Sequence, residues 1–193
     1  MFTERLILAS GSPRRAEILN AVGWQFEVIT SNIDESRKTG ESPDVYVQRL
    51  AIEKAKAVAT TSESGLILAA DTTVVVDHQL LGQPEDDGDA RRMLKLLSGK
   101  WHEVLTGVAL LRIGSEPNVG IETTRVRFAE LSPAEIDWYV STGEPRGKAG
   151  AYAIQGKAAL FIEEVSGDYF NIVGLPIRLV YEMIGNPLPE SNK

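Results

Sequence analysis

GLILAADTTVVVD, residues 65–77, is a strongly apolar run that is rich in β-branched side chains. Valine, isoleucine and threonine favour strands, and a run that is apolar on both faces favours a strand at the centre of a sheet. Asp77 and His78 end the run and suit a tight turn. The sequence therefore predicts a central strand over residues 65–77 that extends into a hairpin near Asp77-His78.

Serine and proline mark the expected helix starts upstream of this strand. Ser12-Pro13 and Ser42-Pro43 each combine a residue that caps helices with one that suits the first helical turn. Gly23 suits the C-terminal cap of the first helix. We therefore expect strands over residues 5–9 and 26–30, and helices over residues 13–22 and 43–60.

Downstream of the strand, the pattern continues to mix strands and helices. Ser132 and Glu135 have the spacing of a capping box, which predicts a helix that continues to Ser141. We also expect helices over residues 86–97 and 176–184, antiparallel strands over 104–113 and 122–131, and a hairpin of residues 160–165 and 169–173. This order predicts an α/β or α+β fold, and no clear linker divides the chain.

The composition limits the classes of function. The chain has 193 residues, of which 43% are hydrophobic and 24% charged, as in ordinary globular proteins. Its formal net charge of −7 disfavours general nucleic-acid binding, so a phosphate site would need a local cluster of Arg and Lys. The absence of cysteine excludes disulfides, thiolate nucleophiles and Cys-based zinc sites.

Neither end of the chain predicts membrane insertion. The apolar run after Arg5 is too short for a signal peptide, and no stretch approaches the roughly 20 apolar residues of a membrane span. We therefore expect a cytoplasmic protein that does not associate with membranes. Residues 186–193 contain two prolines and otherwise mostly polar residues, and we expect them to be irregular.

The segment SGSPRR, residues 10–15, lies between an expected strand and a helix N-terminus. Such an end presents free backbone N–H groups and a partial positive charge, which attract anions. Ser10 adds a hydroxyl donor, and Arg14 and Arg15 can grip phosphate oxygens with two hydrogen bonds each. Two arginines at a helix start are unfavourable unless an anion is present, which favours a phosphate site over a simple cap.

Asp71 interrupts the central strand. A carboxylate in so apolar a run is costly to bury unless it is paired or binds a metal. The alternative is a capping residue at a strand end, but the β-branched continuation argues against it. Asp71 is therefore a candidate metal ligand or general base.

Two further positions could complete such a site. Asp34-Glu35, after the second expected strand, would provide a second carboxylate for magnesium, which prefers oxygen ligands, and Lys54 would provide a cation. Gln155, in a segment of small residues and glycines, could hydrogen-bond to a base edge. Taken alone, acidic loops and lysines on helices are usually solvated surface, and the segment around Gln155 is equally well explained as a tight bend in a sheet.

Together, these segments resemble the Maf family of nucleotide pyrophosphatases. The first matching block is LASGSPRR, residues 8–15, and the others follow in family order over nearly the whole chain. They are RLAIEKA (49–55), ADT (70–72), LGQP (81–84), LLSG (96–99), KAGAYAIQG (148–156), GDY (167–169) and VGLP (173–176).

The resemblance implies a single Maf-like domain over residues 1–193. Its expected fold is α/β, ITPase-like, with a mixed twisted sheet, flanking helices and two lobes around a central cleft. It also implies a divalent metal cofactor, Mg²⁺ or Mn²⁺, held by Asp71 and Glu35, and in many members a homodimer.

The resemblance also implies roles for individual residues. Asp71 takes the place of the catalytic aspartate of the family. The positions that match its substrate-binding or catalytic residues are Ser10, Arg14, Arg15, Glu35 and Lys54. Arg14, Thr72 and Gln155 match the branch that acts on dTTP and UTP, cleaving the triphosphate to monophosphate and pyrophosphate.

Gln83 departs from the family pattern, because many members of this branch have lysine there. Its presence implies a weaker hold on the triphosphate unless Lys100 or Lys148 compensates. Two alternatives stay open at this point: a 7-methyl-GTP pyrophosphatase, and a nucleotide-sensing regulator of cell division with little catalysis. The carboxylate of Asp71 argues against the second, because a pure binder of a polyanion does not need it.

Overall fold

The computed structural model describes residues 4–186, so the tail expected to be irregular lies outside them except for Asn186. The chain forms two compact units. The first comprises the chain up to Asp71, Thr106–Glu122 and the chain from Gly174 onward. The second comprises Thr72–Leu105 and Thr123–Val173. Among residues 4–186, no helix combines the length and hydrophobicity that crossing a bilayer requires.

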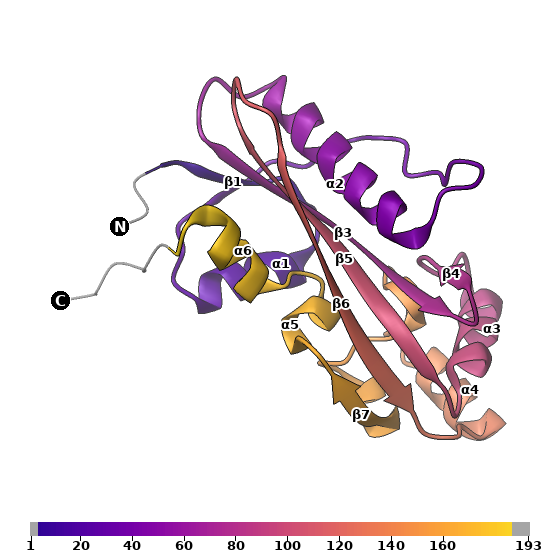
Figure 1. Cartoon of the computed structure of the whole chain (residues 1–193). Helices are drawn as coiled ribbons and strands as arrows, with labels where there is room; N and C mark the ends of the chain where they lie inside the picture. Colours follow the sequence, from indigo (N-terminus) through magenta and orange to yellow (C-terminus); the bar gives the residue numbers. More distant parts are fainter. Residues whose placement is uncertain (1–3, 187–193) are drawn as a thin grey trace. The chain divides into compact units, whose positions relative to one another are not determined.

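The described strands form a mixed sheet with the order β2-β1-β3-β5-β6-β7, and β4 pairs with β3 (Figure 1). β1 (Leu6–Leu8) is parallel to both β2 (Glu27–Val28) and β3 (Leu66–Val76). β3 is the predicted central strand, and every residue of its first half, 66–71, is buried. The predicted α/β fold with a mixed sheet and flanking helices is confirmed.

Three of the described helices belong to the first unit: α1 (Pro13–Ala21), α2 (Pro43–Ala59) and α6 (Ile177–Ile184). α1 and α2 begin at the predicted prolines, and Gly23 follows α1 with a φ of 74° that favours glycine. α2 buries small residues, Ala51 and Ala55, against Ile67 and Ala69 of β3. These residues allow the helix to lie close to the strands that carry the candidate site.

Gly107 sets how closely α2 approaches β5 (Trp101–Arg112). A Cβ atom at this glycine would meet the carbonyl carbon and oxygen of Val47 at 2.5 Å and the amide nitrogen of Gln48 at 2.7 Å. These neighbours are backbone atoms of the helix, so they cannot move aside as a flexible side chain could. The packing of α2 therefore depends on the absence of a side chain at Gly107.

We expect Gly107→Ala to lower the free energy of unfolding by about 3 kcal/mol, because the added methyl group must displace the backbone of a helix. Thermal unfolding would show a melting temperature lower by roughly 6–12 °C. Gly82→Ala is the matched control, since no atom lies within 4 Å of a Cβ there. Equal melting temperatures for the two variants would contradict this packing.

The second unit begins with the predicted hairpin. Asp77 and His78 adopt φ angles of 47° and 62°, and β4 (Gln79–Leu81) returns antiparallel to β3. α3 (Asp87–Leu97) follows, and α4 (Pro133–Ser141) begins with the predicted capping box. The other elements are β6 (Asn118–Phe128), which also enters the first unit, the short 3-10 helices η1 (Ala149–Ala151) and η2 (Lys157–Phe161), and β7 (Ile162–Ser166).

The hairpin predicted over residues 160–165 and 169–173 is wrong in its second half. β7 pairs with β6, but the next element is a helix, α5 (Tyr169–Val173). Asp168 accepts a hydrogen bond from the backbone N–H of Phe170 at 2.7 Å, as a capping residue does. Asn171 is fully buried and donates to the carbonyl of Val104 at 2.9 Å. These contacts override the strand preference of the aromatic and β-branched residues.

His102 lies in the core of the second unit, only 2% exposed. Its ring meets the rings of Phe128 and Tyr152 edge to face, and its Nε2 lies 2.9 Å from the hydroxyl of Tyr152. Burial lowers the pKa of His102 from 6.5 to about 4. The histidine is therefore neutral in the folded protein at neutral pH.

This histidine should make the protein sensitive to acid. Because the folded pKa lies below the unfolded value of 6.5, its contribution to stability is complete above pH 6.5 and is lost as the pH falls toward about 4. The full loss is about 3 kcal/mol. Urea unfolding at about pH 7 and about pH 4.5 measures it. We expect His102→Gln to be less sensitive by most of that amount, and equal pH dependence would contradict the assignment.

Candidate active site

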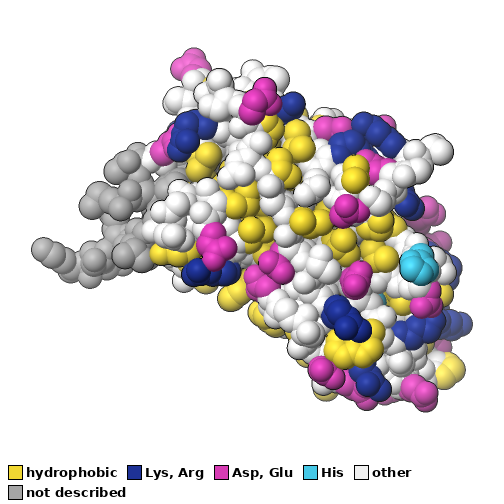
Figure 2. Space-filling view, viewed as in Figure 1, with side chains coloured by type: hydrophobic (Ala, Val, Ile, Leu, Met, Phe, Trp, Pro, Cys, Tyr) yellow, Lys and Arg dark blue, Asp and Glu magenta, His cyan; other side chains and the backbone are white. Residues whose placement is uncertain are grey.

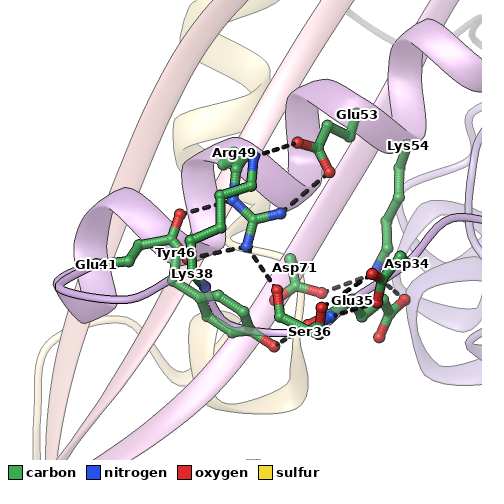
Figure 3. Close-up of polar contacts among 10 residues, drawn as sticks. All are labelled: Asp34, Glu35, Ser36, Lys38, Glu41, Tyr46, Arg49, Glu53, Lys54 and Asp71. Carbon is green, nitrogen blue, oxygen red and sulfur yellow. Dashed lines mark hydrogen bonds and ion pairs between the residues drawn. The ribbon is translucent and has the colours of Figure 1, made fainter.

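Lys54 of α2 is the centre of a buried ion cluster in the first unit. Its Nζ lies 2.6 Å from Oδ1 of Asp71 on β3 and 2.8 Å from Oε1 of Glu35 in the loop before α2 (Figure 3). Lys54 and Asp71 are 9% and 8% exposed, whereas Glu35 reaches in from the surface. Three of the predicted site residues therefore meet, and the lysine joins the two carboxylates.

Burial governs the electrostatics of Asp71. It raises the pKa of the carboxyl group, and the positive charges of Lys54 and Arg15 act in the opposite direction. The strand continues to Val76, so Asp71 does not cap a strand end. A buried carboxylate with a raised pKa next to fixed cations is suited to accept a proton from water.

The segment before α1 forms a second part of the site. Arg15 is 8% exposed; its Nη1 donates to Oγ of Ser10 at 2.9 Å, and its Nε donates to the carbonyl of Gly174 at 2.7 Å. Oγ of Ser10 also accepts from the backbone N–H of Ser12 at 3.2 Å. Ser12 is the N-cap residue by position, but its side chain makes no capping bond. Ser10 therefore organises the loop.

Arg14 and Arg15 are neighbours in the sequence but differ in their contacts with other protein groups. Burial lowers the pKa of both guanidinium groups, and the charges of Asp71 and Glu35 counteract this for Arg15. Arg14 is partly exposed and makes no hydrogen bond or ion pair with any residue between 4 and 186. Arg15 is thus fixed by protein groups, whereas Arg14 is available to an anion at the start of α1.

A family model described as Maf-like protein matches residues 5–186 of this chain. The chain belongs to the Maf family. Among its curated relatives, a protein of Symbiobacterium thermophilum named dTTP/UTP pyrophosphatase is 52% identical, covering 94% of this chain and 93% of the relative. A protein of Bacillus cytotoxicus with the same name is 50% identical, covering 93% of this chain and 94% of the relative.

A solved structure with a similar fold is the Ham1 protein of Staphylococcus aureus. The TM-score is 0.54, and the match covers 94% of this chain and 98% of that chain at 13% sequence identity. At this identity the similarity shows the fold alone. It places this member of the Maf family with the Ham1, or ITPase-like, architecture that the sequence predicted.

A divalent metal ion is expected in a Maf protein, and Asp71 and Glu35 are the residues expected to hold it. No three His, Asp or Glu side chains of residues 4–186 come together as a ready-made metal cluster. Asp71 and Glu35 nevertheless share one cation, the ammonium group of Lys54. Magnesium binds to one or two carboxylates and takes other ligands from water and substrate phosphates. The two carboxylates fit that requirement.

The predicted base-reading residues belong to the second unit. Thr72 follows Asp71 directly on β3 and is partly buried, whereas Gln155 is exposed. Gln83, the departure from the family pattern, is exposed in the segment between β4 and α3. Of the two lysines that could compensate for it, Lys100 forms an ion pair with Asp77 at 2.6 Å.

Glu144 holds the backbone around Gln155. Its carboxylate accepts hydrogen bonds from the hydroxyl of Tyr139 at 2.9 Å and from the backbone N–H of Lys157 at 3.1 Å. A Cβ atom on Gly156 would collide with this carboxylate. The segment is therefore a tightly held turn and not the bend in a sheet that was the alternative interpretation.

Two residues near the site were missed by the sequence analysis. Tyr46 and Arg49, on α2, hold the backbone carbonyls of Glu35 and Ser36 at 3.0 and 3.1 Å. Tyr46 and Arg49 are three positions apart on the helix and so are neighbours on its surface, which gave a signal. Arg49 also begins a block that matches the family, but its role was not considered.

Proposed function

We propose that this chain is a nucleoside triphosphate pyrophosphatase that hydrolyses dTTP and UTP to the monophosphate and pyrophosphate. The observation that carries the proposal is the ion cluster in which the buried Lys54 and Asp71 meet the half-exposed Glu35, and whose two carboxylates favour the positive charge of Arg15. The names and high identity of the relatives support the same activity.

In this proposal, positive groups of the first unit hold the triphosphate. Arg14, Lys54 and the free N–H groups at the start of α1 contact the phosphate oxygens, and Arg15 keeps Ser10 in place beneath them. Lys54 then exchanges its bond to a carboxylate for one to phosphate. Such fixed donors stabilise the charge that develops on the phosphates during cleavage.

Asp71 and Glu35 would hold a divalent cation, Mg²⁺ or Mn²⁺, which when bound neutralises negative charge on the phosphates. Asp71 either serves this binding or takes the proton of the attacking water. The water oxygen forms a bond to the α-phosphorus, and the bond from that phosphorus to the oxygen bridging to the β-phosphate breaks. This reaction needs no covalent intermediate, which agrees with a chain that lacks cysteine.

Thr72 and Gln155 are proposed to read the base. Gln155 carries both a donor and an acceptor, and the turn that holds it is braced by Glu144. A pyrimidine with one N–H and flanking carbonyls, as in thymine and uracil, complements such an amide. The assignment of these two residues comes from the family resemblance.

Pyrophosphate release from dTTP, UTP, CTP, dATP, GTP and 7-methyl-GTP tests the proposed function, with Mg²⁺ or Mn²⁺ supplied and withheld. We expect turnover of dTTP and UTP that needs the cation. Preference for 7-methyl-GTP would replace the substrate assignment, and binding without turnover of any nucleotide would favour a regulator.

Binding to nucleic acid is not part of the proposal. Figure 2 shows Lys and Arg side chains interspersed with Asp and Glu on the face in view, without a broad basic area among the residues described there. The cytoplasmic location and the homodimer stay predictions from the sequence, and light scattering in solution tests the second.

A further inference from the structure

The loop of residues 31–42 between β2 and α2 presents Glu35 to Lys54. It contains no helix or strand, and most of its residues are exposed. The side chain of Glu35 is itself about half exposed, yet its carboxylate lies 2.8 Å from Nζ of Lys54. A loop of this kind needs contacts of its own to keep one carboxylate at a buried ion cluster.

Arg49 and Tyr46 of α2 provide these contacts (Figure 3). Nη2 of Arg49 donates to the carbonyl of Ser36 at 3.1 Å, and the hydroxyl of Tyr46 donates to the carbonyl of Glu35 at 3.0 Å. Two consecutive carbonyl groups of the loop are thus held from the helix that also carries Lys54. The backbone of Glu35 is fixed on its C-terminal side.

Glu41 anchors the other end of the loop to the same arginine. Nε and Nη2 of Arg49 bind its two carboxylate oxygens at 2.6 and 2.9 Å, and both side chains are largely buried. The hydrogen bonds from Arg49 lower the pKa of Glu41 to about 2. Glu41 also accepts from the backbone N–H of Lys38 at 3.1 Å. One planar guanidinium group therefore ties both ends of the segment 36–41.

We propose that Arg49 is a positioning residue, which fixes the loop so that Glu35 faces Lys54 and can help to hold the divalent cation. The inference rests on the proposed function for the role of the cation. Lysine could keep the charge at this position but not the planar fork that binds Glu41 and the Ser36 carbonyl together. The requirement is thus for the geometry of arginine, not only for a cation.

If Arg49 only stabilised the helix, its replacement would change the stability of the protein but not Mn²⁺ binding. Nη1 of Arg49 also binds Glu53 at 3.1 Å, four residues later, and such a pair stabilises a helix without any effect on a neighbouring site. Arg178 and Glu182 on α6 form the same type of pair without contacts to the loop. Arg178→Lys is therefore the matched control for Arg49→Lys.

The test compares Arg49→Lys and Tyr46→Phe with the wild type, each alone and combined with Glu35→Gln. Mn²⁺ binding is measured by the loss of the free-ion electron paramagnetic resonance signal, with a non-hydrolysable α,β-methylene nucleotide present and the loss caused by the nucleotide alone subtracted. The Mn²⁺ dependence of hydrolysis is measured separately. We expect Arg49→Lys to weaken Mn²⁺ binding about tenfold to a hundredfold. Thermal unfolding of Arg49→Lys and Arg178→Lys shows that each variant is folded at the temperature of the binding measurement.

The double variants decide whether Arg49 acts through Glu35. If it does, Arg49→Lys has no further effect on Mn²⁺ binding once Glu35 is glutamine. Equal losses in both backgrounds, or unchanged Mn²⁺ binding, would overturn the proposal, as would a wild type that binds no Mn²⁺. A wild type that binds Mn²⁺ but hydrolyses no nucleotide overturns the proposed function, and the binding measurements still decide the role of Arg49. Tyr46→Phe, which removes only one hydroxyl group, keeps the test decisive if Arg49→Lys unfolds.

Discussion

Asp71→Asn is expected to reduce the turnover of dTTP and UTP about 10³-fold, in the range that general bases contribute. Asparagine keeps the shape of the side chain but cannot accept a proton, and it binds a cation weakly. Lys54 keeps a carboxylate partner in Glu35, so the variant should remain folded. Pyrophosphate release under saturating nucleotide measures the loss.

The control for this variant is Asp77→Asn, the same change at an exposed turn residue. Asn tolerates the positive φ of 47° there, and the ion pair with Lys100 that the change removes is exposed and contributes little, so neither stability nor turnover should change much. If Asp71→Asn retained more than about a tenth of the wild-type turnover, Asp71 could not be the essential base or metal ligand.

The pH dependence gives a second measure of Asp71. Burial raises the pKa of its carboxyl group, and a base acts only when deprotonated. Turnover should therefore fall as the pH drops through a value above the ordinary range of aspartate. The residual activity of Asp71→Asn should lack this acid limb.

The second large effect is expected for Lys54→Met. Methionine fills a similar volume but leaves Asp71 buried without the ammonium at 2.6 Å. Removing one partner of a buried ion pair costs about 3–5 kcal/mol, and the partial access of Glu35 to water places this case at the lower end, about 3 kcal/mol. Urea unfolding measures the change, and nucleotide turnover should be lost as well.

Lys56→Met provides the comparison for Lys54→Met. Lys56 lies on the same helix but is exposed, so its replacement should change the free energy of unfolding by less than about 0.5 kcal/mol. If Lys54→Met and Lys56→Met were equally stable, the loss of the ammonium partner of Asp71 in Lys54→Met would have little cost. The buried Asp71 would then have to be protonated in that variant. A stable Lys54→Met with full activity would contradict the proposed role of the cluster.

Local signals in the sequence predicted much of the fold. Proline and serine marked the starts of α1 and α2, the capping box marked α4, and Asp77-His78 marked the turn after β3. These features depend on residues that are close in sequence. α5 was predicted incorrectly because its position depends on the contact of Asn171 with Val104 of β5, which is distant in the sequence.

In the candidate site, likewise, some features could be predicted from the sequence and others could not. Asp71 was identifiable because a carboxylate in an apolar strand needs a partner, and Lys54 is a partner that it has. The sequence could not show that Arg49 reaches back to Glu41 and Ser36, because this contact forms only when the loop folds over α2. The contact of Arg15 with the carbonyl of Gly174, at the far end of the chain, was equally inaccessible to a local pattern.

Gly107, which lies against α2, affects the Lys54–Asp71 ion pair as well as the packing of the helix. The ammonium of Lys54 belongs to the helix and the carboxylate of Asp71 to the sheet, so the separation of the two layers sets their 2.6 Å distance. A single carbon atom at position 107 adds a bond of roughly 1.5 Å where there is no free space. Lifting the helix by even about 1 Å would take the ion pair beyond hydrogen-bonding distance. The ion pair of Lys54 and Asp71 therefore depends on the absence of a side chain at Gly107, on the neighbouring strand β5.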